Sequence, residues 1–418
     1  MFTKYGLLGR NLSHSYSPEI HRELGNKAYK LYEKEPEELE SFLKGKKSGG
    51  FNVTIPYKRS VLEYADELSD EVKEIGAANT LVIKNGKIHA YNTDMDGFLY
   101  MVKRSGKDFK GRKVLVLGSG GASLAVKAGL EKLEPETVVT VSRKGEDNYR
   151  NIEKHFDADY IINTTPVGMY PDCPASPLSL KGFDSLKGVY DLIYNPFRTE
   201  LVMEAEELGI PSFSGLPMLV AQAARSHELF TGKNVETAEI ERIIEIILKK
   251  YMNIILIGMP GAGKTTVAET LGKLTKRPVI DTDALIEKSS GKTIPEIFKT
   301  EGENGFRQRE TAEIKECGRK SGIIISVGGG AVTREENYMP LHQNGKIYCL
   351  ERDIEKLATD DRPLSKDIKS LEQLFRKRRA CYDRFTDEKI NNNGLEIQTA
   401  EAVLNDWEGD KKSLDRFR

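Results

Sequence analysis

Hydrophobic positions along the chain follow two different spacings. Short apolar runs typical of buried strands recur between longer segments with helical spacing. Before residue 100, the pattern predicts strands at Tyr5–Gly9, Leu31–Glu35 and Gly50–Ile55, and a hairpin over 80–92 that turns at Asn85-Gly86. Later apolar runs predict buried strands at Lys113–Gly118, Thr137–Val141 and Asn253–Gly258. This alternation predicts α/β domains with mostly parallel sheets.

A helix with one apolar face is predicted at Glu236–Tyr251. Ile240, Ile243, Ile244 and Ile247 share that face, so we expect it to pack into a core. The next predicted strand starts almost at once, with no Gly/Ser/Pro linker. We therefore expect a short, stiff junction near residue 251.

Composition narrows the class of protein. A chain of 418 residues is too long for a single core, which predicts two or three domains. A net charge of -1 argues against a general nucleic-acid binder. The four cysteines lie far apart in the sequence and do not have the spacing of metal ligands. We therefore expect them to be free thiols in a reducing compartment. Without a signal-peptide pattern or an apolar run of about 20 residues, we expect a cytoplasmic protein with no membrane partner. These features leave the oligomeric state open.

The run Leu117-Gly-Ser-Gly-Gly-Ala122 follows a predicted strand and opens a helix. Glycines allow a tight turn there, and the helix N-terminus attracts a pyrophosphate, so Gly118, Gly120, Gly121 and Ala122 are candidate dinucleotide ligands. The next strand ends at Ser142-Arg143-Lys144. An acidic residue there would favour NAD, whereas Arg143 and Lys144 would pair with the 2′-phosphate of NADP. The alternatives are a structural glycine corner and a solvated loop charge.

The run Gly258-Met-Pro-Gly-Ala-Gly-Lys-Thr265 is a complete phosphate loop between a strand and a helix. Backbone N–H groups would cradle ATP, Lys264 would reach the β- and γ-phosphates, and the Thr265 hydroxyl would bind Mg²⁺. The ATP-binding candidates are Gly261, Ala262, Gly263, Lys264, Thr265 and Thr266. Asp281 and Asp283 end the next strand as alternate residues and are expected on the same side.

Six motifs over residues 3–250 resemble shikimate dehydrogenase in the family's order: Ser13–Pro18, Asn52–Lys58, Gly76–Thr80, Asn92–Asp94, Asn163–Met169 and Gly215–Ala223. The resemblance implies that Lys58 is the acid–base group for ketone reduction and that Asp94 is its partner. It further implies that Ser15 and Ser17 bind the substrate carboxylate, and that Tyr194 positions the ring. The residues that it implies for the hydroxyls are Thr54, Asn79 and Gln222.

Residues 252–407 resemble shikimate kinase. This resemblance implies that Asp281 orders the Mg²⁺ shell, Asp283 acts as the base, and Arg307 clamps the substrate carboxylate, oriented by Glu310. The other residues that it implies are Gly328, Gly329 and Gly330 at the substrate ring, Arg362 at the phosphates and Arg378 at the carboxylate. The run Arg376–Arg379 leaves the register of Arg378 open by one residue. The lid segment Leu357–Arg362 is short and acidic and lacks an arginine usual in the family.

Both resemblances together imply a bifunctional enzyme of chorismate and aromatic amino acid biosynthesis. It would reduce 3-dehydroshikimate with NADPH and phosphorylate shikimate with ATP and Mg²⁺. The expected fold is an α/β substrate domain (1–100 plus 215–251), a Rossmann NADP domain (101–214), a P-loop α/β domain with a parallel sheet (252–408) and a tail (409–418). The alternatives are a quinate dehydrogenase, a gluconate or nucleoside-monophosphate kinase, and a ligand sensor derived from an enzyme.

Overall fold

In the computed structural model, which describes residues 4–12, 15–44, 48–357 and 368–409, the chain forms three sheets. The first, in the order β2-β1-β3-β5-β6-β4, is mixed. Its strands are β1 (Lys4–Gly9), β2 (Lys30–Glu33), β3 (Ser48–Val53), β4 (Glu67–Leu68), β5 (Thr80–Lys84) and β6 (Lys87–Tyr91).

The other two sheets are parallel throughout their described pairings. The second has the order β11-β10-β9-β7-β8, with β7 (Lys113–Leu117), β8 (Thr137–Val141), β9 (Tyr160–Asn163), β10 (Gly188–Asp191) and β11 (Ser212–Phe213). The third has the order β13-β14-β12-β15-β16, with β12 (Asn253–Ile257), β13 (Val279–Asp281), β14 (Ile324–Ser326), β15 (Gly345–Glu351) and β16 (Glu388–Asn391).

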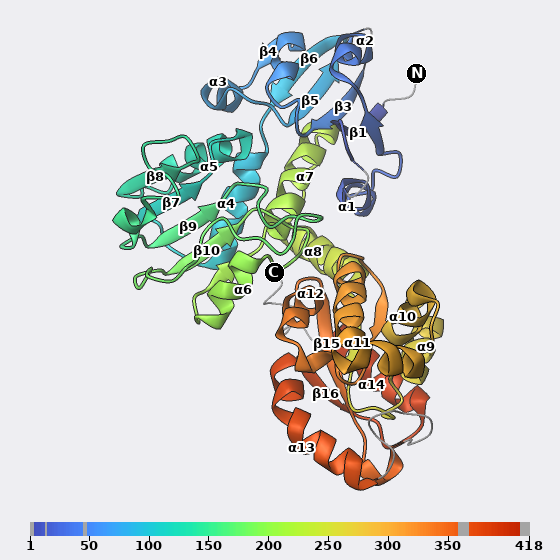
Figure 1. Ribbon diagram of the computed structural model, residues 1–418. Helices are drawn as coiled ribbons and strands as arrows, with labels where there is room; N and C mark the ends of the chain where they lie inside the picture. The colour runs from blue at the N-terminus through green and yellow to red at the C-terminus, as the bar shows by residue number, and fades with distance from the viewer. Residues whose placement is uncertain (1–3, 13–14, 45–47, 358–367, 410–418) are drawn as a thin grey trace.

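Helices α4 and α7 pack along each other between the first two sheets (Figure 1). Helix α8 then leads to the third sheet. The helices up to this point are α1 (Ser17–Glu23), α2 (Leu39–Leu43), α3 (Asp70–Ile75), α4 (Asp94–Ser105), α5 (Gly121–Glu131), α6 (Glu200–Glu207), α7 (Leu216–Thr231) and α8 (Thr237–Tyr251). The later ones are α9 (Lys264–Thr275), α10 (Thr282–Ser290), α11 (Ile294–Gly318), α12 (Tyr338–His342), α13 (Ile368–Phe385) and α14 (Glu396–Gly409).

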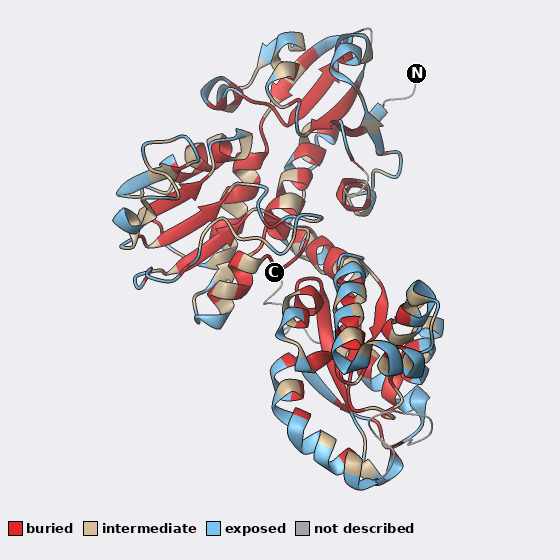
Figure 2. Ribbon diagram, viewed as in Figure 1, coloured by how far each residue is buried: buried red, intermediate tan, exposed pale blue. Residues whose placement is uncertain are grey.

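The buried side chains follow the predicted apolar pattern (Figure 2). Both faces of the second sheet are covered, because Phe98 of α4 packs on one side and Leu201 of α6 on the other. In the third sheet, every residue of the central strand β12 is buried. A strand that is apolar on both faces needs helices on both sides, and this explains its continuous hydrophobic run.

The junction between the second and third sheets is short. Helix α8 ends at Tyr251 and β12 begins at Asn253, with only the fully buried Met252 between them. The apolar face predicted for this helix is confirmed, because Ile240, Ile243, Ile244 and Ile247 are all buried. One apolar cluster therefore runs without a break from the first half of the chain into the second.

The strands and the helix that the sequence predicted lie within two residues of their observed bounds. The hairpin between β5 and β6 turns where predicted, with positive φ angles at Asn85 and Gly86. This hairpin makes the first sheet mixed, because it adds antiparallel strands next to β3, whereas the remaining described pairings of that sheet are parallel.

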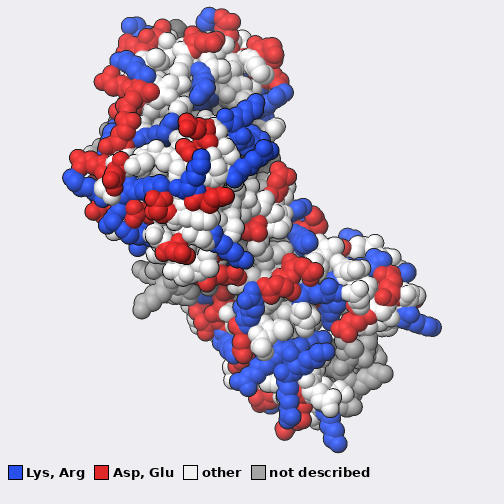
Figure 3. Space-filling view, turned by 60° about the vertical axis from the view of Figure 1, so that its left-hand side comes forward, with Lys and Arg blue, Asp and Glu red and all other residues white. Residues whose placement is uncertain are grey.

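The face shown in Figure 3 carries lysine and arginine side chains interspersed with aspartate and glutamate. This mixture agrees with the net charge of -1. Among the described helices, none is long and apolar enough to cross a bilayer.

Candidate active sites

Lys58 and Asp94 form an ion pair between the first two sheets. The Nζ atom of Lys58 lies 2.5 Å from Oδ2 of Asp94. Asp94 opens helix α4, and its other oxygen accepts a 2.9 Å hydrogen bond from Nδ2 of Asn79. The same Asn79 nitrogen lies 3.4 Å from Oε1 of Gln222 on α7. Four predicted site residues thus share one hydrogen-bonded group, and the carboxylate is held from both sides.

A buried polar cluster behind this group fixes Asn79. The side-chain oxygen of Asn79 accepts a 2.7 Å hydrogen bond from the backbone N–H of Thr93. The hydroxyl of Ser226 lies 3.0 Å from that of Thr93, 2.8 Å from that of Thr80 and 2.7 Å from Nδ2 of Asn52. Sequence reasoning gave Ser226 no role. Its position one helical turn after Gln222, on the same face of α7, was the available signal.

Ser15 and Ser17 lie at the start of α1, where the Ser15 hydroxyl accepts a 3.2 Å hydrogen bond from the Ser17 N–H. Thr54, which follows β3, packs its methyl group against Gly9 at the end of β1. Tyr194 lies next to this segment, because its ring is 5.3 Å from that of Tyr16. Ser15, Ser17 and Tyr194 are thus close to Tyr16, and the substrate-binding roles expected for them stay predictions.

The glycine-rich turn after β7 approaches the lysine of the ion pair. Gly118 has a φ of +106°, and a Cβ there would lie 2.8 Å from Oγ1 of Thr164, so only glycine fits. A Cβ added to Gly121 would lie 4.0 Å from Cδ of Lys58. Gly120 caps α5, whose first residues are Gly121 and Ala122. The helix N-terminus expected to bind a pyrophosphate is thus next to the proposed proton donor.

Ser142, Arg143 and Lys144 follow β8, the strand beside β7. Arg143 and Lys144 are exposed, as ligands of a 2′-phosphate on a bound dinucleotide need to be.

Asp191, at the end of β10, has a structural role that was not predicted from the sequence. It is fully buried, accepts hydrogen bonds from Asn163 at 3.0 Å and Thr199 at 2.6 Å, and its pKa is raised to about 6 by burial.

In the third sheet, the phosphate loop connects β12 to α9. Nζ of Lys264 donates to the carbonyls of Gly258 and Met259 at 3.0 and 3.1 Å. The Thr265 hydroxyl donates to Oδ2 of Asp281 at 2.7 Å. The loop lines a cavity of ≈ 610 Å³ together with Gly261, Gly263, Thr266, Asp283 and Arg307. Ala262 is fully buried beneath it.

Arg307 lines the same cavity. Its Nη1 atom donates a 2.6 Å hydrogen bond to Oε2 of Glu310. Both side chains are buried, and Nε of Arg307 and Oε1 of Glu310 have no hydrogen-bond partner among the described residues. Burial raises the pKa of Glu310 to about 7, with Asp283 adding to the rise and Arg307 opposing it. The unused polar atoms are suited to bind a polar ligand.

The three glycines after β14 make room for these side chains. A Cβ added to Gly328 would lie 2.3 Å from Oε1 of Glu310 and 2.8 Å from Oδ1 of Asp283. A Cβ at Gly330 would lie 2.0 Å from Nη2 of Arg307. The carbonyl of Gly329, between them, accepts from Nη1 of Arg378 at 3.1 Å.

The structure also answers the register question in the run 376–379. Arg378 is buried and lines the cavity, whereas Arg376, Lys377 and Arg379 are exposed. Arg362 lies outside the described residues. Arg352, which sequence reasoning missed, lines the same cavity, and its Nη1 would be 3.4 Å from a Cβ at Gly263.

Comparison with known proteins agrees with both halves of this geometry. Residues 7–81 match the model for the shikimate dehydrogenase substrate binding domain. A shikimate dehydrogenase (NADP(+)) from Caldanaerobacter subterraneus subsp. tengcongensis is 39% identical over 256 residues, which cover 55% of this chain and 91% of that protein. The chain belongs to the shikimate dehydrogenase family.

Two solved structures extend the likeness to this family's fold. Shikimate 5-dehydrogenase from Thermus thermophilus in complex with NADP(H) and shikimate has a TM-score of 0.53 and 32% identity, covering 59% of this chain and 99% of that one. Quinate dehydrogenase from Corynebacterium glutamicum in complex with NAD has a TM-score of 0.53 and 27% identity, covering 59% of this chain and 98% of that one.

The second half of the chain matches a different family model, because residues 260–408 match the shikimate kinase model. A shikimate dehydrogenase and a shikimate kinase domain are thus joined in one chain.

Proposed function

We propose that the chain catalyses two consecutive reactions: NADPH-dependent reduction of 3-dehydroshikimate to shikimate, and ATP-dependent phosphorylation of shikimate to shikimate 3-phosphate. One observation carries the proposal. The same chain holds a Lys–Asp pair against a dinucleotide turn and, in a separate cavity, a phosphate loop together with a buried guanidinium. The first product is the second substrate.

In the reduction, NADPH supplies hydride to the carbonyl carbon. Lys58 then donates a proton to the carbonyl oxygen, and its ammonium stabilises negative charge as it develops. Asp94 holds the ammonium in place through the 2.5 Å contact, and Asn79 in turn holds Asp94. The hydroxyls of Ser15 and Ser17 would bind the substrate carboxylate at the edge of the site.

Arg143 and Lys144 are proposed to select NADP, because they stand where an acidic residue would bind an unphosphorylated ribose. Ser142 completes this loop after β8. The pyrophosphate would lie on Gly118, Gly120, Gly121 and Ala122 at the N-terminus of α5.

In the kinase half, Asp283, which lines the cavity, would accept the proton of the acceptor hydroxyl. Asp281 fixes its backbone, because Oδ1 of Asp281 accepts the N–H of Asp283 at 3.0 Å. Arg307 and Arg378 would bind the substrate carboxylate, and Gly328, Gly329 and Gly330 would let the ring approach the backbone. Binding of the carboxylate by these arginines would orient the acceptor hydroxyl toward the phosphoryl group held by the phosphate loop.

The residues present fit a bound Mg²⁺. The hydroxyl of Thr265 and the carboxylate of Asp281 are adjacent oxygen ligands below the phosphate loop. Among the described residues, no group of three or more His, Cys, Asp or Glu side chains is arranged to hold a metal. Mg²⁺ ordinarily takes only one or two protein ligands and completes its shell with phosphates and water. When bound, it would neutralise charge on the phosphates.

The test uses the purified full chain with 3-dehydroshikimate, NADPH, ATP and Mg²⁺. Shikimate 3-phosphate should form, shikimate should accumulate without ATP, and nothing should react without NADPH. Quinate with NAD⁺ or NADP⁺ serves as the control substrate, because a related fold belongs to a quinate dehydrogenase. Faster turnover of quinate than of shikimate, or no phosphorylated product, would overturn the assignment.

A further inference from the structure

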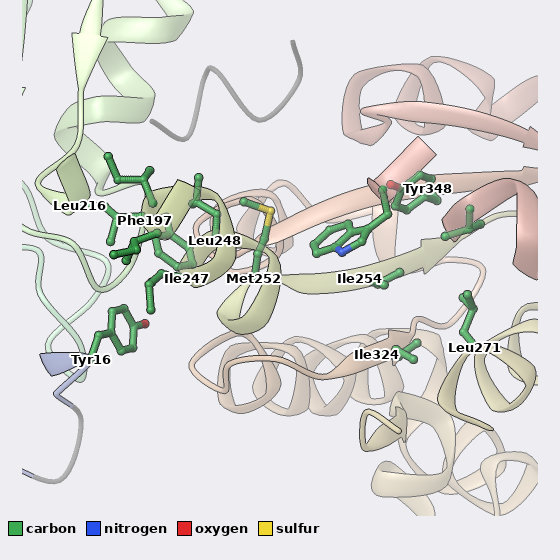
Figure 4. Packing of buried hydrophobic residues seen from close by; sticks show 14 of the residues in the cluster. Tyr16, Phe197, Leu216, Ile247, Leu248, Met252, Ile254, Leu271, Ile324 and Tyr348 are labelled. Carbon is green, nitrogen blue, oxygen red and sulfur yellow. The ribbon is translucent and has the colours of Figure 1, made fainter. Parts of the chain in front are cut away.

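Tyr16, between the two serines expected to bind the carboxylate, is buried at 4% exposure. Its ring stacks on that of Tyr251 with a centroid separation of 4.3 Å and an interplanar angle of 20°. The rings of Tyr194 and Phe197 lie 5.3 and 6.2 Å away. Figure 4 shows Tyr16 beside Phe197 and Ile247, at one end of the apolar cluster that continues through Met252 to Ile254. The serine segment thus rests on the junction of the two enzymes.

The stacking partner is hydrogen-bonded to the kinase half, although it is itself the last residue of the segment expected to belong to the dehydrogenase. Tyr251 is the last residue of α8, and its carbonyl accepts a 2.7 Å hydrogen bond from the N–H of Gly322, just before β14. The following residue, Met252, is fully buried, and β12 then pairs with β14 and β15. Tyr251 therefore cannot move without disturbing the central strands of the kinase sheet.

Two ion pairs bind helix α1 to α8. Glu19 lies 2.5 Å from Nζ of Lys250, and its side chain is only 10% exposed. Glu23 lies 3.1 Å from Arg242. Because α1 begins at Ser17, these contacts and the Tyr16 stack hold the segment that carries the two serines against α8.

The segment after Tyr194 is also attached to the kinase half. The Phe197 N–H donates to Oδ1 of Asn344 at 2.9 Å, and the Arg198 N–H donates to the Gln343 carbonyl at 3.0 Å. The guanidinium of Arg198 donates to the carbonyl of His342 at 3.2 Å. Both Tyr16 and the segment that carries Tyr194 are thus supported by the kinase half.

We propose that Tyr16 is a positioning residue, through which the kinase half holds the substrate-carboxylate site of the dehydrogenase. The inference rests on the proposed function, since it assumes that Ser15 and Ser17 bind the carboxylate. Tyr16 touches neither Lys58 nor the dinucleotide turn in any described ring or polar contact. Its loss should therefore weaken substrate binding while leaving the proton donor and the cofactor site in place.

The experiment compares Tyr16→Leu with Tyr16→Phe in the full chain. Tyr16→Leu removes the stacked ring and should raise the KM for 3-dehydroshikimate about 10-fold, the scale of one aromatic pair. The KM for NADPH and the rate of the kinase reaction should each stay within about twofold of the wild-type value. Tyr16→Phe keeps the ring and should retain the wild-type KM for 3-dehydroshikimate. Tyr251→Leu, which removes the ring from the other side, should reproduce the selective rise.

An unchanged KM in Tyr16→Leu would overturn the proposal. So would an equal rise in Tyr16→Phe, because the ring would then not be the cause. A parallel loss of kinase activity or of NADPH binding would show a merely structural role and would also overturn it. Failure of the wild-type protein to reduce 3-dehydroshikimate would refute the proposed function instead, so the two failures are distinguishable.

Discussion

Gly330→Ala should impair the kinase by displacing its buried guanidinium. The added Cβ would lie 2.0 Å from Nη2 and 2.3 Å from Cζ of Arg307, whereas ordinary contacts begin at 3.4 Å. The backbone cannot easily retreat, because the preceding carbonyl of Gly329 accepts hydrogen bonds from Arg378 and Tyr382. Arg307 must therefore move by more than an ångström. A displacement of that size in a positioning group costs roughly 10²-fold in rate, or about 2.7 kcal/mol.

The assay is steady-state kinetics of both reactions on one preparation. We expect kcat/KM for shikimate to fall about 10²-fold, mostly through KM, while reduction of 3-dehydroshikimate is unchanged and reports correct folding. Gly409→Ala is the matched control, because a Cβ there meets no heavy atom of the described residues within 4 Å. If Gly330→Ala retained the wild-type KM for shikimate, Arg307 would not bind the substrate and the reasoning would be refuted.

Four further variants test other parts of the two sites. Lys58→Ala should lower the reduction rate by about 10³-fold and spare the kinase, whereas loss of both activities would contradict independent sites. Lys264→Met should do the reverse, with a fall of roughly 10²-fold or more, and an unchanged phosphorylation rate would rule out this phosphate loop. Arg143→Ala should raise the KM for NADPH far more than that for 3-dehydroshikimate; equal effects would refute its 2′-phosphate role. Because burial raises the pKa of Glu310 from 4.5 to about 7, the folded chain binds the extra proton between those values, and the kinase half should lose stability as pH rises through that window. Glu310→Gln should remove this slope in urea unfolding measured from pH 5 to 8, and an identical slope in both proteins would contradict it.

Polar contacts join the two halves of the chain at the junction. The Phe197–Arg198 segment is hydrogen-bonded to backbone and side-chain atoms of His342, Gln343 and Asn344, so under the proposed positioning role a displacement of the kinase half would also disturb the dehydrogenase site. The apolar cluster that includes Met252 leaves little room for hinge motion there, since close-packed interiors resist small displacements.

The sequence alone determined those features that depend on neighbours along the chain. The strands, the glycine turns after β7 and β12 and the face of α8 follow from local periodicity and backbone conformation, and Lys58, Asp94, Lys264 and Arg307 were found because each lies within a recognisable motif. Tertiary structure alone decided what depends on residues far apart in sequence. Ser226 reaches Asn52 across 174 positions, and Arg378 was selected from a run of basic residues only because it is the one that the cavity buries. Tyr16 lies within the Ser13–Pro18 motif, but that motif predicts no role for it. The role proposed for it arises from a ring contributed more than two hundred residues later, because long-range packing leaves no local pattern in the sequence.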